Sequence, residues 1–351
     1  AASVTSNAAT LTVASGGGVA AGSLYGWGFN GGGIIGLGDG TTTNRLSPVQ
    51  IGSSNWSAVA CSGGHTLAVT SGGMLYSWGM NNYGELGDGT KDFRLSAVQI
   101  GSQSWSKVAA GAYFSFGIRA DGKLFGWGNN REGQIGLDTS VNEYLSPVQI
   151  GTDNWSAIAL TYLHAAAIRS DGKLFTWGQN SGGKLGDGTT TDRTTPTQIG
   201  MDSWTAVAVG YLNTAAIRSD GKLFVWGSNG FGQIGDGTTT QRNTPTQIGT
   251  DNWTAVASGE GCVFAIRSDG KLFAWGKNSV GQLGDGTTTN RNTPTQIGTD
   301  SWTAVSASFR TTLAIRSDGK LFGWGDNQLG TVGDGTDRKS TRLNSSHEWI
   351  S

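Results

Sequence analysis

The sequence lacks the features that define several large classes of protein. No run of apolar residues approaches the ~18 needed for a helix to span a bilayer, so we expect no membrane insertion. The 24 basic and 25 acidic side chains give a net charge of −1, so no strong field would attract nucleic acid. No segment repeats its apolar residues with the period of a helix. These absences favour a β-protein that does not bind nucleic acid.

Residues suited to metal binding or catalysis are also scarce. Cys61 and Cys262 lie far apart, which gives neither a CxxC metal motif nor a disulfide framework. His65, His164 and Cys262 each lie nine residues after a tryptophan, and this equal phase places them in alternate units of a repeat, too far apart to share one zinc ion. No nucleophile, base and orienting acid recur together in any unit. We therefore expect no enzyme, no metal and no cofactor.

Glycine and tryptophan, in contrast, recur at fixed positions. Glycine contributes 59 of the 351 residues. A Trp-Gly pair recurs at intervals of 49 to 51 residues, beginning at Trp27, Trp78, Trp127, Trp177, Trp226, Trp275 and Trp324. The run RSDGKLFVWG (218–227) returns in near copies, and its Asp-Gly step predicts a tight turn between two strands. The chain is therefore a tandem array of one β-hairpin unit.

Each full unit divides into four short β segments. In residues 205–249 they are TAVAVG, TAAIRS, KLFVWG and TPTQIG, separated by clusters of Gly, Asn, Asp and Thr. A period near 50 residues with four strands per unit predicts an all-β, seven-bladed β-propeller of four-stranded antiparallel blades. The Ala- and Val-rich strand is expected to lie innermost, where space is smallest. The tryptophans are expected to fill the space between blades.

The runs WGSNGFGQIG (226–235) and WGKNSVGQLG (275–284) resemble the core of the regulator of chromosome condensation repeat. The resemblance covers about 315 residues and implies a seven-bladed propeller. Most members carry GxxHT after the inner strand, and here only His65 with Thr66 keeps it. The family also implies guanine-nucleotide exchange on a small GTPase through a protruding loop, for which units of 49 to 51 residues leave no room. A secreted enzyme inhibitor, such as the beta-lactamase inhibitor that shares this fold, is a further alternative.

Both ends of the chain depart from the repeat. Residues 1–21 are expected to be the end of a preceding domain or a linker, and residues 1–14 resemble the last strand of a bacterial immunoglobulin-like domain. The propeller is assigned to residues 22–336, and residues 337–351 match the translation of a sequencing adapter. We expect native sequence beyond Thr336 to supply a fourth strand for the last blade and an inner pair for the first. The resemblance at the N-terminus favours an extracellular or cell-surface bacterial protein.

Two polar patterns also recur. Gly-Asp-Gly-Thr offers one carboxylate per unit, which predicts a turn, because calcium needs several converging acids. Two sets of arginines recur at fixed phases and are expected to link neighbouring blades. They are Arg119, Arg169, Arg218, Arg267 and Arg316 in one set, and Arg45, Arg94, Arg193, Arg242 and Arg291 in the other.

Differences among the near-identical units indicate a binding face. No residue is held constant among the units at the positions seven to nine residues after the second tryptophan, and those after Trp-Gly also vary, whereas SDGK hardly changes. Both variable sets belong to the first or third loop of a blade, which lie on the same face of an antiparallel sheet. The candidate binding residues are Met80, Tyr83, Tyr113, Phe114, Arg131, Tyr162, Leu163, His164, Tyr211, Asn213, Phe231, Glu260, Phe309 and Arg310.

These residues favour a non-enzymatic scaffold that binds a protein or a glycan, because aromatic residues, Arg and Met are enriched at interface cores. The alternative is that several of the aromatic side chains fold inward and plug the mouth of the central channel.

Overall fold

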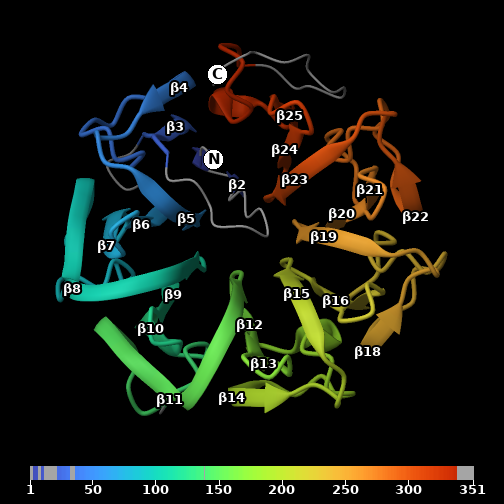
Figure 1. The fold of residues 1–351 in the computed structure, drawn as a ribbon, viewed down its shortest axis with the longest axis horizontal. Coiled ribbons are helices and arrows are strands. Elements are labelled where there is room, and N and C mark those ends of the chain that lie inside the picture. The colour runs from blue at the N-terminus through green and yellow to red at the C-terminus, as the bar shows by residue number, and fades with distance from the viewer. Residues whose placement is uncertain (1–2, 7–8, 12–21, 32–35, 138, 338–351) are drawn as a thin grey trace.

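The computed structural model describes residues 3–6, 9–11, 22–31, 36–137 and 139–337, and in it the chain forms a ring of β-sheets (Figure 1). The fifth blade shows the plan of the unit. It contains β15 (Trp204–Val209), β16 (Asn213–Arg218), β17 (Leu223–Gly227) and β18 (Arg242–Gln247), in that order from the channel outward and all antiparallel. These are the four segments that the sequence predicts.

The remaining blades repeat this plan. Blades two to four form one continuous sheet, because β8 and β11 each run from the outer edge of one blade to the inner edge of the next. The strands of this sheet are β5 (Trp56–Ser62), β6 (His65–Thr70), β7 (Met74–Gly79), β8 (Arg94–Ala110), β9 (Phe114–Arg119), β10 (Lys123–Asn129), β11 (Glu143–Leu160), β12 (His164–Arg169), β13 (Leu174–Gly178) and β14 (Arg193–Gln198). Blade six contains β19 (Trp253–Ser258), β20 (Cys262–Arg267), β21 (Leu272–Gly276) and β22 (Arg291–Gln296). Blade seven contains β23 (Trp302–Ala307), β24 (Thr311–Arg316) and β25 (Leu321–Gly325).

The first blade is assembled differently. Its outer strands are β3 (Leu24–Gly28) and β4 (Arg45–Gln50), and its inner strands are β1 (Ser3–Ser6) and β2 (Ala9–Leu11), in the order β2-β1-β3-β4. The pairing of β1 with β3 is parallel, unlike the antiparallel pairs of the repeat. The N-terminal strands thus occupy the inner positions of the first blade that we expected sequence beyond Thr336 to fill, while blade seven has three strands among the described residues. The proposed domain boundaries stay predictions, and residues 338–351 lie outside the described part of the chain.

The Trp-Gly tryptophans join the blades, as predicted. All of them are almost completely buried. Six of them lie against the first glycine of Gly-Asp-Gly in the preceding blade; a Cβ at Gly235, for example, would lie 2.6 Å from Trp275 Nε1. Trp177 lies in the same way against Gly136, which begins a Gly-Leu-Asp run. The ring is closed by the same contact, because a Cβ at Gly333 would lie 2.6 Å from Trp27 Nε1, and this indole donates to the Thr331 carbonyl at 3.1 Å. The tryptophans therefore form the blade interfaces.

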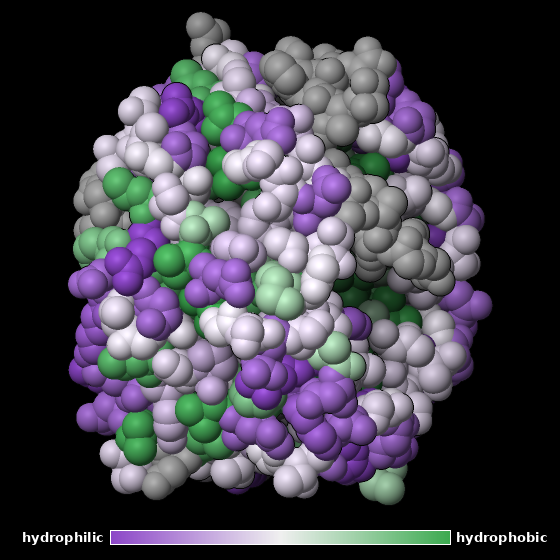
Figure 2. Space-filling model, turned by 60° about the vertical axis from the view of Figure 1, so that its left-hand side comes forward, coloured by the Kyte–Doolittle hydropathy of each residue, from purple (hydrophilic) through white to green (hydrophobic). Residues whose placement is uncertain are grey.

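One side of the molecule shows a mixed surface. In the view of Figure 2, apolar side chains lie scattered among hydrophilic ones. The helices of the described residues are the short turns η1 (Ser181–Gly183) and η2 (Gln328–Gly330), and no described helix has the length to cross a bilayer.

Candidate binding face

The two variable sets of residues meet on one side of the disc. Tyr83, which follows the third strand of blade two, packs edge-on against Tyr113, which follows the inner strand of blade three, with ring centroids 5.3 Å apart. Lys277, after Trp-Gly in blade six, lies 2.9 Å from Glu260, which follows the inner strand of the same blade. We call the side formed by these inner-strand turns and Trp-Gly loops the variable face. The opposite side, formed by the SDGK turns between the second and third strands, is called the Asp-Gly face.

A pocket opens at the centre of the variable face. It encloses about 760 Å³ of empty space, part of it open to solvent, and is lined by the ends of inner strands and the turns that follow them. Its walls carry mostly small residues such as Ala110, Val209 and Ser258, whereas Tyr162, Tyr211 and Phe309 supply large aromatic groups. The pocket is therefore the mouth of the central channel.

An aromatic cluster of Tyr83, Tyr113, Tyr162, Tyr211 and Phe309 extends to this mouth. The Tyr162 ring lies 5.4 Å from Tyr211 and 5.7 Å from Phe309, and Tyr211 lies 5.9 Å from Phe309, between ring centroids. Since these three residues belong to blades four, five and seven, the cluster reaches across the channel. Tyr211 is nevertheless 39% exposed and Phe309 45% exposed. The side chains thus narrow the mouth and still present ring surface to solvent.

Charged side chains surround the cluster. The Arg131 guanidinium lies 5.4 Å from the centre of the Tyr83 ring, and Lys277 Nζ lies 5.2 Å from that of Phe231. Arg310 lies 3.7 Å from Asp326 in the following loop. Burial, followed by the neighbouring Tyr113 hydroxyl, raises the pKa of Tyr162, so its hydroxyl stays neutral at physiological pH.

Four of the candidate residues lie inside the protein. Met80 is only 7% exposed, and Phe114, His164 and Asn213 are fully buried. Their expected place on the surface of a loop is wrong, because β9, β12 and β16 begin at these last three residues and turn their first side chains inward. Phe114, for example, packs on Phe116 with ring centroids 5.6 Å apart. These four residues are unavailable to a partner, and Leu163 is half-buried.

His164 joins two blades by hydrogen bonds. The Thr214 hydroxyl of blade five donates to the Lys184 carbonyl at 2.7 Å, so its oxygen accepts from His164 Nε2 at 3.1 Å. This assigns the ring proton to Nε2 and leaves Nδ1 to accept from the Thr161 hydroxyl at 3.1 Å. Burial, and then the nearby Lys184 charge, lowers the pKa of His164 well below its usual value. The histidine is a neutral structural group.

His65 has the same role between blades two and three. Its Nε2 lies 2.7 Å from the Ser115 hydroxyl, which donates to the Glu85 carbonyl at 2.7 Å. Burial lowers the pKa of His65 to about 3. A hydroxyl residue fifty positions further along the chain is the sequence signal that would have identified both of these links. Among the described residues, no group of three His, Cys, Asp or Glu side chains could hold a metal ion.

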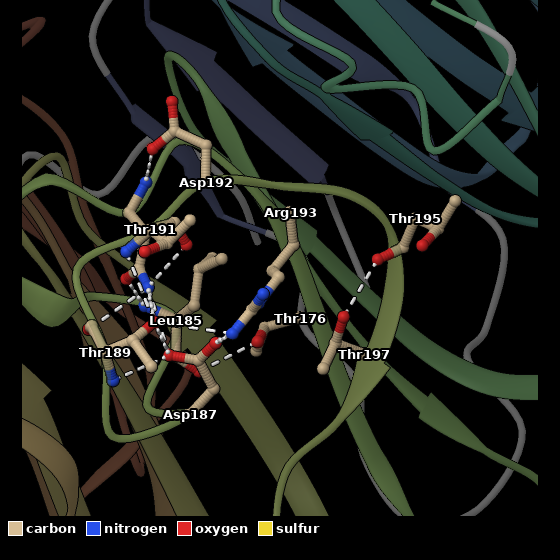
Figure 3. Close-up of polar contacts among 10 residues, drawn as sticks. Thr176, Leu185, Asp187, Thr189, Thr191, Asp192, Arg193, Thr195 and Thr197 are labelled. Atoms are coloured by element: carbon tan, nitrogen blue, oxygen red, sulfur yellow. Dashed lines mark hydrogen bonds and ion pairs between the residues drawn. The ribbon is translucent and has the colours of Figure 1, made fainter.

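A polar network shapes the Gly-Asp-Gly-Thr loop, as blade four illustrates (Figure 3). Asp187 Oδ1 accepts from the backbone nitrogen and hydroxyl of Thr189 at 3.0 and 2.7 Å, while Oδ2 binds Arg193 Nε at 2.6 Å. Asn180 Nδ2 donates to the same carboxylate at 3.1 Å. Burial alone would raise the pKa of Asp187, but the hydrogen bonds from Thr189 and Arg193 outweigh it and lower the pKa. The predicted turn is confirmed.

The expectation that the recurrent arginines link neighbouring blades is wrong. Arg193 binds the aspartate six residues earlier in its own loop, and the other units show the same pairing, namely Arg45 with Asp39, Arg94 with Asp88, Arg242 with Asp236 and Arg291 with Asp285. Arg218 likewise binds Asp220 two residues further on, and it stacks on Phe224 of its own blade. Carboxylates within the same unit bind these arginines, whereas Arg119 stacks on Trp105 and Phe125 of its own blade and forms no ion pair among the described residues.

The sequence matches the family model of the RCC1-like domain over residues 6–261. The chain belongs to the RCC1-like domain family. Models of the regulator of chromosome condensation (RCC1) repeat match residues 253–282, 269–315 and 302–331 of this RCC1-like propeller. The resemblance noted in the sequence is therefore confirmed, and so is the seven-bladed fold that it implies.

Solved structures share the whole ring. Human WBSCR16 is similar with a TM-score of 0.82 and 21% identity, covering 92% of this chain and 93% of that one. Yeast RCC1 (Prp20), solved bound to Kap60, is similar with a TM-score of 0.79 and 20% identity, covering 91% and 83%. The ultraviolet-B receptor UVR8 of Arabidopsis thaliana is 44% identical over 68 residues, which span 18% of this chain and 15% of the receptor. At these levels the structural likeness shows the fold alone.

Proposed function

We propose that this RCC1-like propeller is a non-enzymatic scaffold that binds a protein through its variable face. The observation that carries the proposal is the aromatic cluster, which leaves Tyr211 and Phe309 substantially exposed at a pocket mouth whose residues vary among the repeats. Exposed aromatic side chains contribute little to folding, whereas buried at an interface they are among the strongest contributors to affinity.

The similar structures support a protein partner over a glycan. One Prp20p structure was described together with its binding to Gsp1p and histones, and another with Kap60 bound, so this fold serves protein recognition in those cases. The same likeness supports a second candidate function, guanine-nucleotide exchange on a small GTPase. A nucleotide-release assay with purified GTPases tests it directly. An extracellular or cell-surface location in a bacterium, and action as an enzyme inhibitor, remain predictions.

A pair of matched triple variants tests the binding face. The partner is first captured, identified by mass spectrometry and purified. Its binding should be abolished by the triple variant Tyr162→Ala, Tyr211→Ala and Phe309→Ala. The control triple, Asp220→Ala, Asp269→Ala and Asp318→Ala, changes the Asp-Gly face and should leave the Kd unchanged. Circular dichroism would establish that both variants are folded. Loss of binding in the control alone would place the interface on the opposite face and overturn the proposal.

A further inference from the structure

We propose that the pocket on the variable face receives one basic side chain, an arginine or a lysine, that projects from the partner protein. Tyr162, Tyr211 and Phe309 would supply aromatic surface for the cation, and Glu260 would supply the opposite charge. This inference rests on the proposed function, since it names the part of the partner that enters the pocket.

The shape of the pocket favours a single side chain. The pocket lies at the mouth of the channel, and inner-strand turns from blades two to seven contribute to its walls. These turns lie so close together that only glycine fits between them. A Cβ at Gly210 would lie 2.5 Å from the Gly259 carbonyl oxygen, and a Cβ at Gly259 would lie 2.4 Å from the Ser308 carbonyl oxygen. Turns packed this tightly hold a fixed opening. An extended side chain can enter it, whereas a strand or helix of the partner must stay above it.

The aromatic groups at the mouth suit a cation. Arg131 over Tyr83 and Lys277 over Phe231 show that rings of the variable face already bind the chain's own cations, at 5.4 and 5.2 Å. Both distances lie within the ~6 Å range of a cation–π interaction. Among the described residues, no arginine or lysine lies over the rings of Tyr162, Tyr211 or Phe309. These three rings are therefore open to a cation from a partner.

The charge of the pocket has the matching sign. Of the described residues that line it, Glu260 is the only charged one. The corresponding positions of the other units hold Gly63, Ala112, Tyr162, Tyr211 and Phe309. Lys277 binds Glu260 Oε1 at 2.9 Å, but Oε2 is buried and has no hydrogen-bond partner.

A buried carboxylate oxygen without a donor is costly, and a guanidinium or ammonium group carries donors and no acceptors. Protein atoms cover Oε2 in this structure, so a basic side chain in the pocket would reach it once the Glu260 side chain turns toward the pocket, and its charge would then lie between this oxygen and the aromatic rings. A neutral guest of the same shape could supply the donor but not the charge. This difference separates the proposal from general apolar binding.

The test uses the full chain and three short peptides, acetyl-Gly-Gly-X-Gly-Gly-amide with X as arginine, lysine or citrulline. Citrulline keeps the shape of arginine and removes its charge. Calorimetry or ligand-observed NMR should show saturable binding of the arginine and lysine peptides, with citrulline about tenfold weaker, as expected for a cation–π site with a counter-charge. Glu260→Gln, Tyr211→Leu and Phe309→Leu should each weaken the arginine peptide several-fold.

The matched control is Glu132→Gln, which removes an exposed acid from the same face outside the pocket lining and should change nothing. Equal affinity for arginine and citrulline, or unchanged affinity in Glu260→Gln, would overturn the inference. So would binding of an oligosaccharide such as maltohexaose in place of the peptides.

If the captured partner needs the aromatic cluster but is insensitive to Glu260→Gln and to the arginine peptide, the scaffold function stands and this inference is lost. If the peptides bind as expected while no partner needs the cluster, the scaffold function fails and the pocket assignment stands.

Discussion

On the Asp-Gly face four of the five recurrent arginines bind acids of their own unit, whereas on the variable face aromatic side chains pack against those of other units. Arg218 lies 2.7 Å from Asp220 and 3.5 Å from Asp202, and the units of Arg169, Arg267 and Arg316 repeat this geometry. Tyr162, in contrast, touches rings from three other blades. A unit whose polar groups are satisfied internally can be copied unchanged, while a surface built jointly by several units can differ in each.

The largest expected effect comes from a glycine beside the variable face. Gly235 has φ +86° and no room for a Cβ, which would lie 2.6 Å from Trp275. Gly249, which follows the fourth strand at the Asp-Gly face, has φ +61° and nothing within 4 Å. Gly235→Ala should cost about 3 kcal/mol or more from backbone strain and overpacking, and Gly249→Ala about 1 kcal/mol from strain alone. Denaturant unfolding measures both, and equal costs would contradict the role of the tryptophan contact.

The next effect compares two aspartates that both bind arginine. The Asp187 side chain is 7% exposed and also holds Thr189 and Asn180, whereas the Asp220 side chain is 47% exposed. Asp187→Ala should cost about 2 to 3 kcal/mol, because it leaves buried donors without an acceptor. Asp220→Ala should leave the unfolding midpoint within experimental error, since exposed ion pairs are screened by water. Similar losses in the two variants would contradict the distinction between the buried and the exposed aspartate.

Acid should destabilise the protein mainly through its buried histidines. The pKa of His65 falls from its usual 6.5 to about 3 on folding, so the unfolded chain binds the proton more readily and stability declines as the pH falls from 6.5 toward 3. At pH 5 the loss should be about 2 kcal/mol. Hydrogen bonds from Arg218 lower the pKa of Asp220 to about 2, but this pair is exposed, so protonation of Asp220 below pH 3.8 should change stability little. His65→Asn should reduce the slope of the unfolding free energy between pH 7 and 5 without removing it, because the pKa of His164 is also lowered on folding. An unchanged slope would contradict this account.

The smallest expected effect is a gain in stability. Lys184 is buried with its Nζ 2.8 Å from Gln179, and burial lowers its pKa to about 8. Because its pKa is depressed on folding, Lys184 is destabilising below its unfolded value of 10.5. Gln134, Gln233 and Gln282 occupy the same position in other units. Lys184→Gln should therefore stabilise the protein by about 1 kcal/mol at pH 7, and by less above pH 10. A loss of stability at pH 7 would contradict this interpretation.

The period of the sequence was enough to predict the blades, because four apolar segments and a tryptophan recur in almost the same form. The candidate site could be predicted from the sequence only in part. Whether His164 or Asn213 faces the interior depends on the residue at which its strand begins. A shift of the strand by one position would place the side chain on the other face of the sheet. The meeting of Tyr162 with Phe309 depends on ring closure, which no local pattern contains. The parallel strand β1 departs from the repeat and could not be predicted from it.

The contact of Trp27 with Thr331 joins residues 304 positions apart, whereas the same indole bond in the other blades that make it joins residues 42 or 43 apart. Closing a loop of 304 rather than about 42 residues costs roughly 1.8 kcal/mol more in chain entropy. During folding, the interfaces between sequence neighbours can therefore form before the two ends of the array meet. The interface between blades seven and one is then the last to form and the first to open. Although the blades look alike, the ring therefore closes and opens at one interface.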